Sequence, residues 1–267
     1  NYVLRLLIYM HKATKEAKLN SSWINPDDDY AAAIEWFVRG ALDREKNAPF
    51  LQSLAGLVTR TAGPGACNAL AQVLLKIGAP GVADFYQGTE LWDLNLVDPD
   101  NRRPVDFALR QAALEAIERR AGENRGQLLK DLIQHWPDGR IKLYLTSTAL
   151  RFRREHRELF LSGEYLPLAP NGPQAEHLFG FARRQGSSWA MIVVPRCVAG
   201  LVETGSLMPA PGLWQGTTVP LSPTAPTQWH HVLTGETIPA TMTAEGSHLP
   251  ADKLLSSFPV ALLTATH

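Results

Sequence analysis

Residues 98–104, which read DPDNRRP, place several kinds of polar side chain in one short loop. A residue that precedes proline is pushed toward an extended backbone, as expected of Asp98, and Asp100 and Asn101 can close a turn with their own side chains. The planar guanidinium groups of Arg102 and Arg103 suit carboxylates or paired hydroxyls. The loop therefore either recognises a polar ligand or is a salt-bridged brace.

The segment before this loop, residues 81–93 with the sequence GVADFYQGTELWD, carries a second set of candidate binding residues: Tyr86, Gln87 and Glu90. Its aromatic and β-branched residues lie between glycines, which predicts one buried strand over 81–88. Alternation along that strand puts Asp84 and Tyr86 on one face and Phe85 and Gln87 on the other, so the two sets cannot face one site together. Tyr86 is either a core aromatic residue or a surface that stacks on a sugar.

Helices are predicted around these segments from the spacing of apolar residues and from capping signals. Residues 25–29, NPDDD, supply an N-cap, a proline at the first helical position and carboxylates near the positive end of the helix dipole. The segment 142–146 also suits a strand. The expected helices are 3–17, a helix ending near 42, and then 67–77, 106–121, 127–134 and 141–157.

Beyond residue 160 the sequence changes to short apolar runs between proline-rich and glycine-rich loops, which indicates antiparallel β structure. Strands are predicted at 178–183, 189–194, 229–233 and 258–263. We therefore expect two domains, 1–160 and 161–267. His230 and His231 lie in one of these strands, and without a third ligand at a recognisable spacing they indicate a surface pair, with no metal site. Trp23 is expected to pack at a helix start, with a sugar groove as the alternative.

The composition narrows the classes of partner. The 267 residues include 26 lysines and arginines and 26 aspartates and glutamates, so no global field attracts nucleic acid or an anionic membrane, and a neutral substrate such as a sugar fits. With only two cysteines, no membrane-length apolar run and no signal-peptide pattern, a cytoplasmic protein is expected. The first residue is not methionine and a helical pattern starts almost at once, which indicates an upstream segment. No cofactor is expected.

The sequence resembles the maltooligosyltrehalose synthase family of the α-amylase superfamily. Residues 80–90 followed by 98–104 are similar to the eighth strand of the superfamily's barrel and the loop after it, and the QGTELWD run at 87–93 is similar to that family in particular. The segments 22–26, 139–144 and 153–156 also resemble it. Over 170–267 the similarity is weaker and rests mainly on position.

The resemblance implies an α/β barrel fragment, the last strand and helices of a (β/α)8 barrel, followed by a C-terminal antiparallel β-sandwich domain. It also implies that the aspartate nucleophile, the glutamate acid/base and a second aspartate lie upstream, so no catalytic residue is expected in this chain. The expected partners are a maltooligosaccharide and the upstream part of the same enzyme.

The reaction that the resemblance implies is a retaining isomerisation, in which the α-1,4 bond at the reducing end of a maltooligosaccharide becomes an α,α-1,1 bond. The residues expected to hold the sugar or close over it are Tyr86, Gln87, Glu90, Asp98, Asp100, Asn101, Arg102 and Arg103. Two other functions remain open: another glucan hydrolase or transferase of the superfamily, and a carbohydrate-binding module without chemistry.

Overall fold

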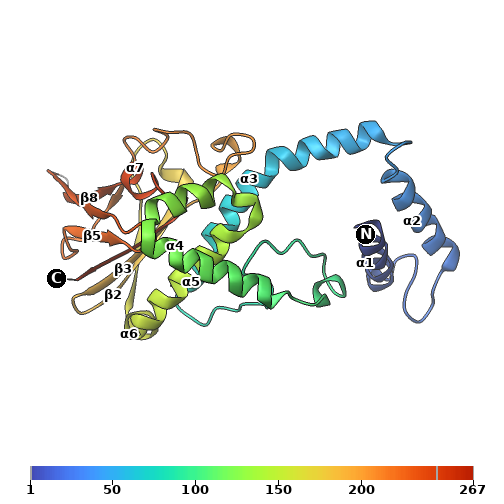
Figure 1. Ribbon diagram of the computed structural model, residues 1–267, viewed down its shortest axis with the longest axis horizontal. Coiled ribbons are helices and arrows are strands. Elements are labelled where there is room, and N and C mark those ends of the chain that lie inside the picture. Colours follow the sequence, from blue (N-terminus) through green and yellow to red (C-terminus); the bar gives the residue numbers. More distant parts are fainter. Residues whose placement is uncertain (1, 245, 267) are drawn as a thin grey trace. The chain divides into compact units, whose positions relative to one another are not determined.

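The computed structural model describes residues 2–244 and 246–266, in which six helices precede antiparallel strands and a short seventh helix lies between the last two strands (Figure 1). The helices are α1 (Tyr2–Ala17), α2 (Asp28–Ala41), α3 (Ala48–Gly78), α4 (Phe107–Gln134), α5 (Arg140–Glu155), α6 (Arg157–Ser162) and α7 (Ala251–Leu254). The strands are β1 (Glu164–Leu168), β2 (Leu178–Gln185), β3 (Ser188–Pro195), β4 (Thr218–Pro220), β5 (Gln228–His231), β6 (Thr237–Pro239), β7 (Thr241–Thr243), β8 (Gly246–Pro250) and β9 (Ala261–Thr266).

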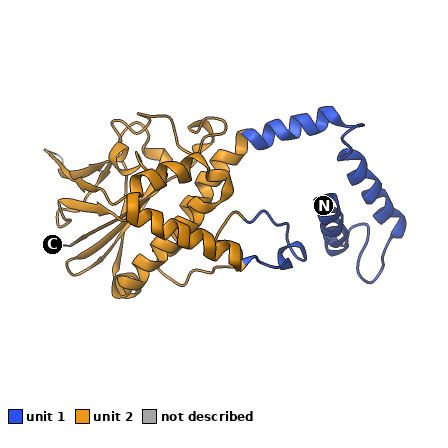
Figure 2. Cartoon of the chain, viewed as in Figure 1, with its two compact units in different colours: residues 1–59, 93–106 blue, residues 60–92, 107–267 orange. Residues whose placement is uncertain are grey.

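The chain divides into two compact units, coloured separately in Figure 2. Unit 1 comprises residues 1–59 and 93–106, and unit 2 comprises residues 60–92 and 107–267. In unit 1, α1 contacts α2 and the short 3-10 turn Asp100–Arg102. The predicted helix is confirmed, but it starts two residues later than expected: Pro26 lies outside it, and the N-cap is Asp27, whose carboxylate accepts a hydrogen bond from the Tyr30 amide at 2.8 Å.

Unit 2 is built on a six-stranded sheet in the order β1-β2-β3-β9-β5-β6, with a second sheet in the order β4-β8-β7. All of the strand pairs are antiparallel. Successive residues of β3 alternate between two apolar cores: Ala190 and Ile192 belong to the core shared with α3, α4 and α5, and Trp189 and Met191 to the core shared with the second sheet. Burial on both faces explains why residues 189–194 form a continuous apolar run.

Most of the predicted helices are confirmed, with changes at their ends. α3 begins well before the predicted residue 67, and residues 141–157 form α5 and the start of α6, not a strand. The two helices predicted on either side of 122–126 are joined at a kink, where Asn124 leaves helical geometry and its side chain accepts a hydrogen bond from the Gln127 amide at 3.0 Å. The last predicted strand begins later, at Ala261.

The strand predicted over residues 81–88 is wrong. Residues 82–86 have no regular secondary structure, residues 87–90 form a turn, and no described segment pairs with them. A strand needs a neighbour to accept and donate its backbone hydrogen bonds, so its residue types alone do not produce one. Gly81 and Gly88, with φ of 107° and 92°, lie in the region that favours glycine and bend the segment at both ends.

The surface pair predicted at His230 and His231 is wrong for His231. Side chains alternate across β5, so His230 is exposed and His231 is fully buried. Burial lowers the pKa of His231 to about 4, against the smaller opposing effect of Glu236. Trp23 is also more exposed than its predicted packing role requires, at 58%, and the Lys15 ammonium lies 5.0 Å from its ring centroid.

A buried arginine joins the helices to the main sheet in unit 2. Arg183 of β2 is 1% exposed and donates hydrogen bonds to the carbonyl groups of Gly78, Phe160, Gly163 and Glu164. The first two carbonyls lie in the last turns of α3 and α6, where helices leave carbonyl oxygens unpaired and favour cations. Arg183 therefore holds two helix ends against the β1–β2 hairpin.

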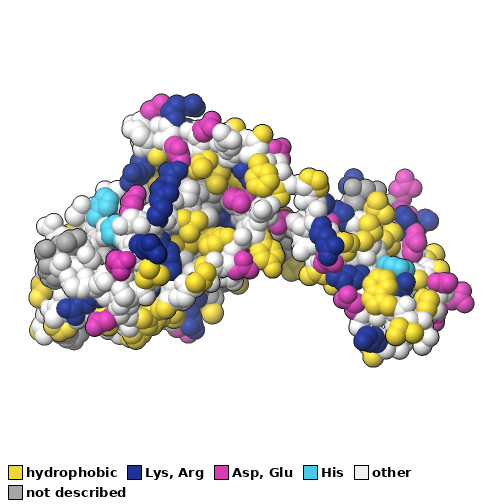
Figure 3. Space-filling view, turned by 90° about the horizontal axis from the view of Figure 1, so that it is seen from below, with side chains coloured by type: hydrophobic (Ala, Val, Ile, Leu, Met, Phe, Trp, Pro, Cys, Tyr) yellow, Lys and Arg dark blue, Asp and Glu magenta, His cyan; other side chains and the backbone are white. Residues whose placement is uncertain are grey.

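The surface carries both signs of charge. Figure 3 shows lysine and arginine side chains interspersed with aspartate and glutamate on the face that it presents. This fits the balanced composition. None of the helices in the described part of the chain is long and apolar enough to cross a membrane. Across residues 2–244 and 246–266, no group of three or more histidine, cysteine, aspartate or glutamate residues is arranged to hold a metal ion.

Candidate functional site

The segment 81–92, here called the first loop, follows α3, and two basic side chains hold its backbone in place. Arg153 of α5 donates hydrogen bonds to the carbonyl groups of Ile77, Ala79 and Gly81. Lys76 donates to the Asp84 carbonyl at 2.9 Å, and its ammonium group lies 3.8 Å from the centroid of the Phe85 ring. These contacts fix the first part of the loop although it has no strand partner among the described residues.

The turn that follows is held by Arg110 of α4. Its Nε atom lies 2.9 Å from Glu90 Oε2, and its NH2 group donates to the Gly88 carbonyl at 2.7 Å. The Thr89 hydroxyl also donates to the Tyr86 carbonyl, at 2.6 Å. A planar fork that binds a carboxylate and a carbonyl together orients both, so the position of Glu90 is defined by unit 2 itself.

The end of the first loop packs beside the start of α5. The Trp92 indole donates to the Trp136 carbonyl at 2.7 Å, and the two rings meet edge to face with their centroids 6.3 Å apart. Gly139, at φ 82°, lies so close to the end of the first loop that a Cβ atom added there would be 2.9 Å from the backbone nitrogen of Trp92. The close approach requires glycine at this position.

A pocket of about 380 Å³ opens beside the first loop. Tyr86 and Glu90 line it, and Gln87 does not. The opposite walls carry polar residues that the sequence interpretation missed: Gln72 and Lys76 of α3, and Lys142 and Thr146 of α5. Each pair is spaced four residues apart, which puts both members on one helix face, and this spacing of polar residues was the available signal.

Thr146 is the most informative of these residues. It is 8% exposed, and its hydroxyl has no hydrogen-bond partner among the described residues. A buried hydroxyl without a partner is unfavourable, by about 1–3 kcal/mol. Thr146 also lines the pocket, which makes its hydroxyl a candidate contact for a polar molecule bound there.

The second loop, residues 93–106 of unit 1, is organised by Asp100. Its carboxylate receives two hydrogen bonds from Arg5 of α1, from Nε to Oδ1 and from NH2 to Oδ2, both 2.7 Å long. The Leu96 amide also donates to it at 2.7 Å. The hydrogen bonds from Arg5 are the main cause that lowers the pKa of Asp100 to about 2. With a side chain only 5% exposed, Asp100 braces the loop.

The neighbouring candidates are more accessible. Asp98 pairs with Lys12 at 3.2 Å and with Arg102, whose side chain is 76% exposed. Arg103 donates to the Asn95 side chain and, at 3.2 Å, to the Asp100 carbonyl. Asn101 is exposed. The structure therefore brings Asp98, Asp100, Arg102 and Arg103 together in unit 1, and Tyr86 and Glu90 at the pocket of unit 2.

No family model matches the chain. Curated relatives from Mycobacterium tuberculosis, named putative maltooligosyl trehalose synthase, are 38% identical over 259 residues, which are 97% of this chain and 28% of the relative. The chain thus spans less than a third of their length.

Solved structures show the same partial coverage. Maltooligosyltrehalose synthase from Arthrobacter ramosus is 34% identical with a TM-score of 0.74, over 99% of this chain and 30% of that protein. Another crystal structure of a maltooligosyl trehalose synthase is 27% identical with a TM-score of 0.66, again over 99% of this chain and 30% of that one.

Proposed function

The chain is homologous to the C-terminal portion of maltooligosyltrehalose synthases, and from this premise we propose that the full-length protein converts the reducing-end α-1,4 linkage of a maltooligosaccharide into an α,α-1,1 linkage. The observation that carries the proposal is 38% identity along 97% of the chain. The coverage extends through both units and both sheets, so the similarity is not confined to one common motif.

We propose that the helical part, residues 1–160, completes a (β/α)8 barrel and that residues 161–267 form a separate β domain. The first loop is compatible with this placement, because it has no strand partner among the described residues and a strand from the rest of the protein would supply one. In such barrels the segments after the strands form the site. The first loop would then lie at the end where substrate binds.

The proposed reaction is an intramolecular transfer with retention. A carboxylate from the rest of the protein attacks the anomeric carbon of the penultimate glucosyl unit, and a carboxylic acid protonates the departing oxygen of the terminal glucose. The glucose turns, and its anomeric hydroxyl attacks the glycosyl-enzyme bond while the second carboxylate accepts the proton. Two carboxyl groups about 5 Å apart suit this double displacement. Water must be excluded, because it would otherwise release free glucose.

The residues of this chain would hold the glucose between the two steps. The 380 Å³ pocket is near the lower end of the usual range for small ligands, about 300–1,000 Å³, and so suits one or two sugar rings. Tyr86 offers an aromatic face, Glu90 a carboxylate oriented by Arg110, and Thr146 a hydroxyl without a partner. Gln87, Asn101, Arg102 and Arg103 are exposed and available to contact the sugar, while Asp98 and Asp100 hold the second loop.

The test is to incubate the full-length protein with maltopentaose and to separate the products. We expect a product of unchanged mass that resists reduction by borohydride, because an α,α-1,1 linkage leaves no reducing end. Shorter reducing sugars as the main products would mean that the protein is a hydrolase. Binding without any product would mean that it is a carbohydrate-binding module. The 267-residue chain alone serves as the comparison and should give no product.

A further inference from the structure

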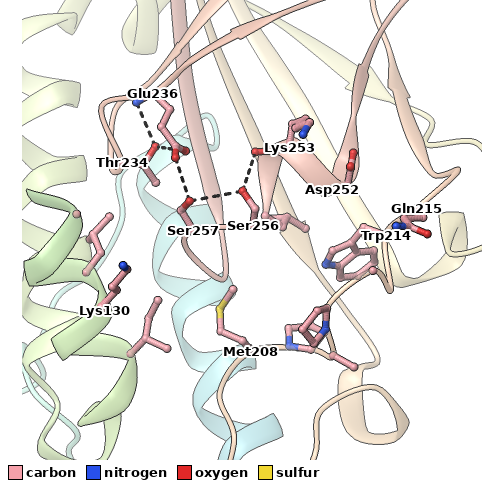
Figure 4. A pocket seen from close by; sticks show the side chains of 18 of the residues that line it. Lys130, Met208, Trp214, Gln215, Thr234, Glu236, Asp252, Lys253, Ser256 and Ser257 are labelled. Carbon is pink, nitrogen blue, oxygen red and sulfur yellow. Dashed lines mark hydrogen bonds between the residues drawn. The ribbon is translucent and has the colours of Figure 1, made fainter.

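A groove of unit 2 is separate from the pocket beside the first loop. It has a volume of about 810 Å³ and lies between the second half of α4, the loop 208–215, the turn 234–236 and the segment 252–257 (Figure 4). It shares no lining residue with the smaller pocket. The volume falls within the range of sites that hold an organic ligand.

One edge of the groove is a row of hydroxyl groups around a carboxylate. The Ser257 hydroxyl donates to Glu236 Oε1 at 3.0 Å, and the Thr234 hydroxyl donates to Oε2 at 2.9 Å. The Ser256 hydroxyl lies 3.5 Å from that of Ser257. Hydroxyl groups donate and accept, and a carboxylate has lone pairs beyond these two bonds, so the row can exchange hydrogen bonds with a ligand that itself carries hydroxyls.

Trp214 adds an unused donor. It is 5% exposed, and among the described residues none accepts a hydrogen bond from its indole N–H. By contrast, carbonyl groups accept the indole N–H of Trp136 and of Trp229. Figure 4 shows the Trp214 nitrogen on the edge of the ring that faces the groove. The indole nitrogen is not among the buried polar atoms that lack a hydrogen-bond partner, so it is accessible and can donate a hydrogen bond to a ligand in the groove.

The remaining lining is apolar or electrically balanced. Leu129, Ile133, Met208, Pro209 and Leu255 form apolar walls. The charged residues are Lys130 and Lys253 against Glu236 and Asp252, so the groove has no net charge. This balance disfavours phosphorylated or acidic ligands and suits a neutral molecule with both apolar faces and many hydroxyls.

We propose that the groove is a second carbohydrate-binding site, which takes a stretch of a neutral oligosaccharide. The C–H faces of the sugar rings lie against the apolar walls, while the hydroxyls contact Glu236, Ser256, Ser257 and the Trp214 indole N–H. That the oligosaccharide is an α-1,4-glucan rests on the proposed function. Such a site would hold the distant part of a long chain and raise the local concentration of its reducing end.

The experiment measures binding of borohydride-reduced maltoheptaose to the full-length protein by isothermal titration calorimetry. The reduced sugar has no anomeric hydroxyl at its end, so the proposed isomerisation cannot consume it. The variants are Trp214→Phe, which removes the donor and keeps an aromatic ring, and Ser256→Ala combined with Ser257→Ala. The control is Ser162→Ala, which removes an exposed, hydrogen-bonded hydroxyl of the same unit away from the groove.

We expect the wild-type protein to bind the sugar, and both groove variants to weaken one class of sites by about tenfold, as the loss of one or two hydrogen bonds implies. Ser162→Ala should bind as the wild type does. Absence of binding by the wild-type protein, or wild-type binding by the serine double variant at an unchanged Tm, would overturn the proposal. Product formation from unreduced maltopentaose is measured separately, so the proposed function and the groove stand or fall on different data.

Discussion

Arg5 and Asp100, 95 positions apart in the sequence, form a two-point ion pair in which both N···O distances are 2.7 Å. The pair joins the first helix of unit 1 to the second loop, and Arg103 and Leu96 converge on the same carboxylate. The nearly buried Asp100 carboxylate thus stabilises the loop in which Asn101 and Arg102 are exposed to solvent. Its geometry depends on a residue that the sequence places far from it.

The first prediction concerns acid. The folded-state pKa of Asp100 is about 2, well below the usual value, so its contribution is complete above pH 4 and is lost as the pH falls through about 2. The protection factors of residues 93–106 in hydrogen–deuterium exchange, which compare the measured rate with the intrinsic rate at each pH, should fall over that range. In Asp100→Asn they should already be low at pH 7, and in the more exposed Asp98→Asn they should be reduced less. Equal protection in Asp100→Asn and the wild type would contradict a bracing role.

The second prediction separates binding from stability at Thr146. The Thr146 hydroxyl has no partner among the described residues. Thr146→Val should therefore leave the unfolding free energy unchanged or raise it by up to about 1 kcal/mol, with a Tm that is equal or higher. If the hydroxyl contacts the sugar, KM for maltopentaose should rise by about fivefold to tenfold. Thr148→Val, on the same helix but outside the pocket lining, is the control. An unchanged KM would remove Thr146 from the site.

The third prediction concerns Arg103. The guanidinium fork of Arg103 contacts Asn95 and the Asp100 carbonyl, and a lysine keeps the charge without the fork. If the second loop closes over the departing glucose, Arg103→Lys should raise the ratio of free glucose to trehalosyl product several-fold, because water reaches the glycosyl-enzyme. Arg102→Lys gives the comparison. A lower Tm with an unchanged ratio would leave Arg103 as a structural residue only.

The fourth prediction concerns His231. Its folded-state pKa of about 4 lies below the ordinary value near 6.5, so the unfolded chain binds the proton more readily. Stability should therefore fall as the pH drops from about 6.5 to about 4, by up to about 3 kcal/mol. His231→Asn should flatten this slope, whereas exposed His230→Asn should not. Urea unfolding at several pH values measures both, and equal slopes in all three proteins would exclude His231 as the cause.

The fifth prediction concerns Gly139. An alanine there would have to adopt positive φ and place its Cβ atom 2.9 Å from the Trp92 nitrogen. Gly139→Ala should cost about 2 kcal/mol of unfolding free energy and disturb the end of the first loop. Gly186→Ala, also at positive φ but with open space around its Cβ position, should cost less. Similar Tm values for the two variants would show that Trp92 moves aside freely.

Features that depend on residues close together in the sequence could be predicted, and features that depend on tertiary neighbours could not. α2 was predictable because its acidic first turn and its apolar spacing are local, although its N-cap is Asp27 and lies two residues later than expected. The strand expected at 81–88 failed because pairing partners, not residue types, make a strand. His231 was misplaced because the face of β5 that is buried depends on its neighbours in the sheet. Of the candidate site, the two loops were predicted from their polar residues. Lys142 and Thr146 could not be predicted, because only the tertiary structure places α5 beside the first loop.

Arg153 and Arg183 affect the order in which the nascent chain can complete its hydrogen bonds. The carbonyl groups of Gly78 and Gly81 at the root of the first loop receive their hydrogen bonds from residues 105 and 72 positions later. A ribosome that adds about 5–20 residues per second needs roughly 5–20 seconds to deliver Arg183 after Gly78. During that interval the Gly78 carbonyl has no hydrogen bond from Arg183 and can be hydrated instead. The start of the first loop therefore receives its last hydrogen bonds only after the β1–β2 hairpin has been synthesised, so a substitution that displaces Arg183 should also disturb the end of α3 that precedes this loop.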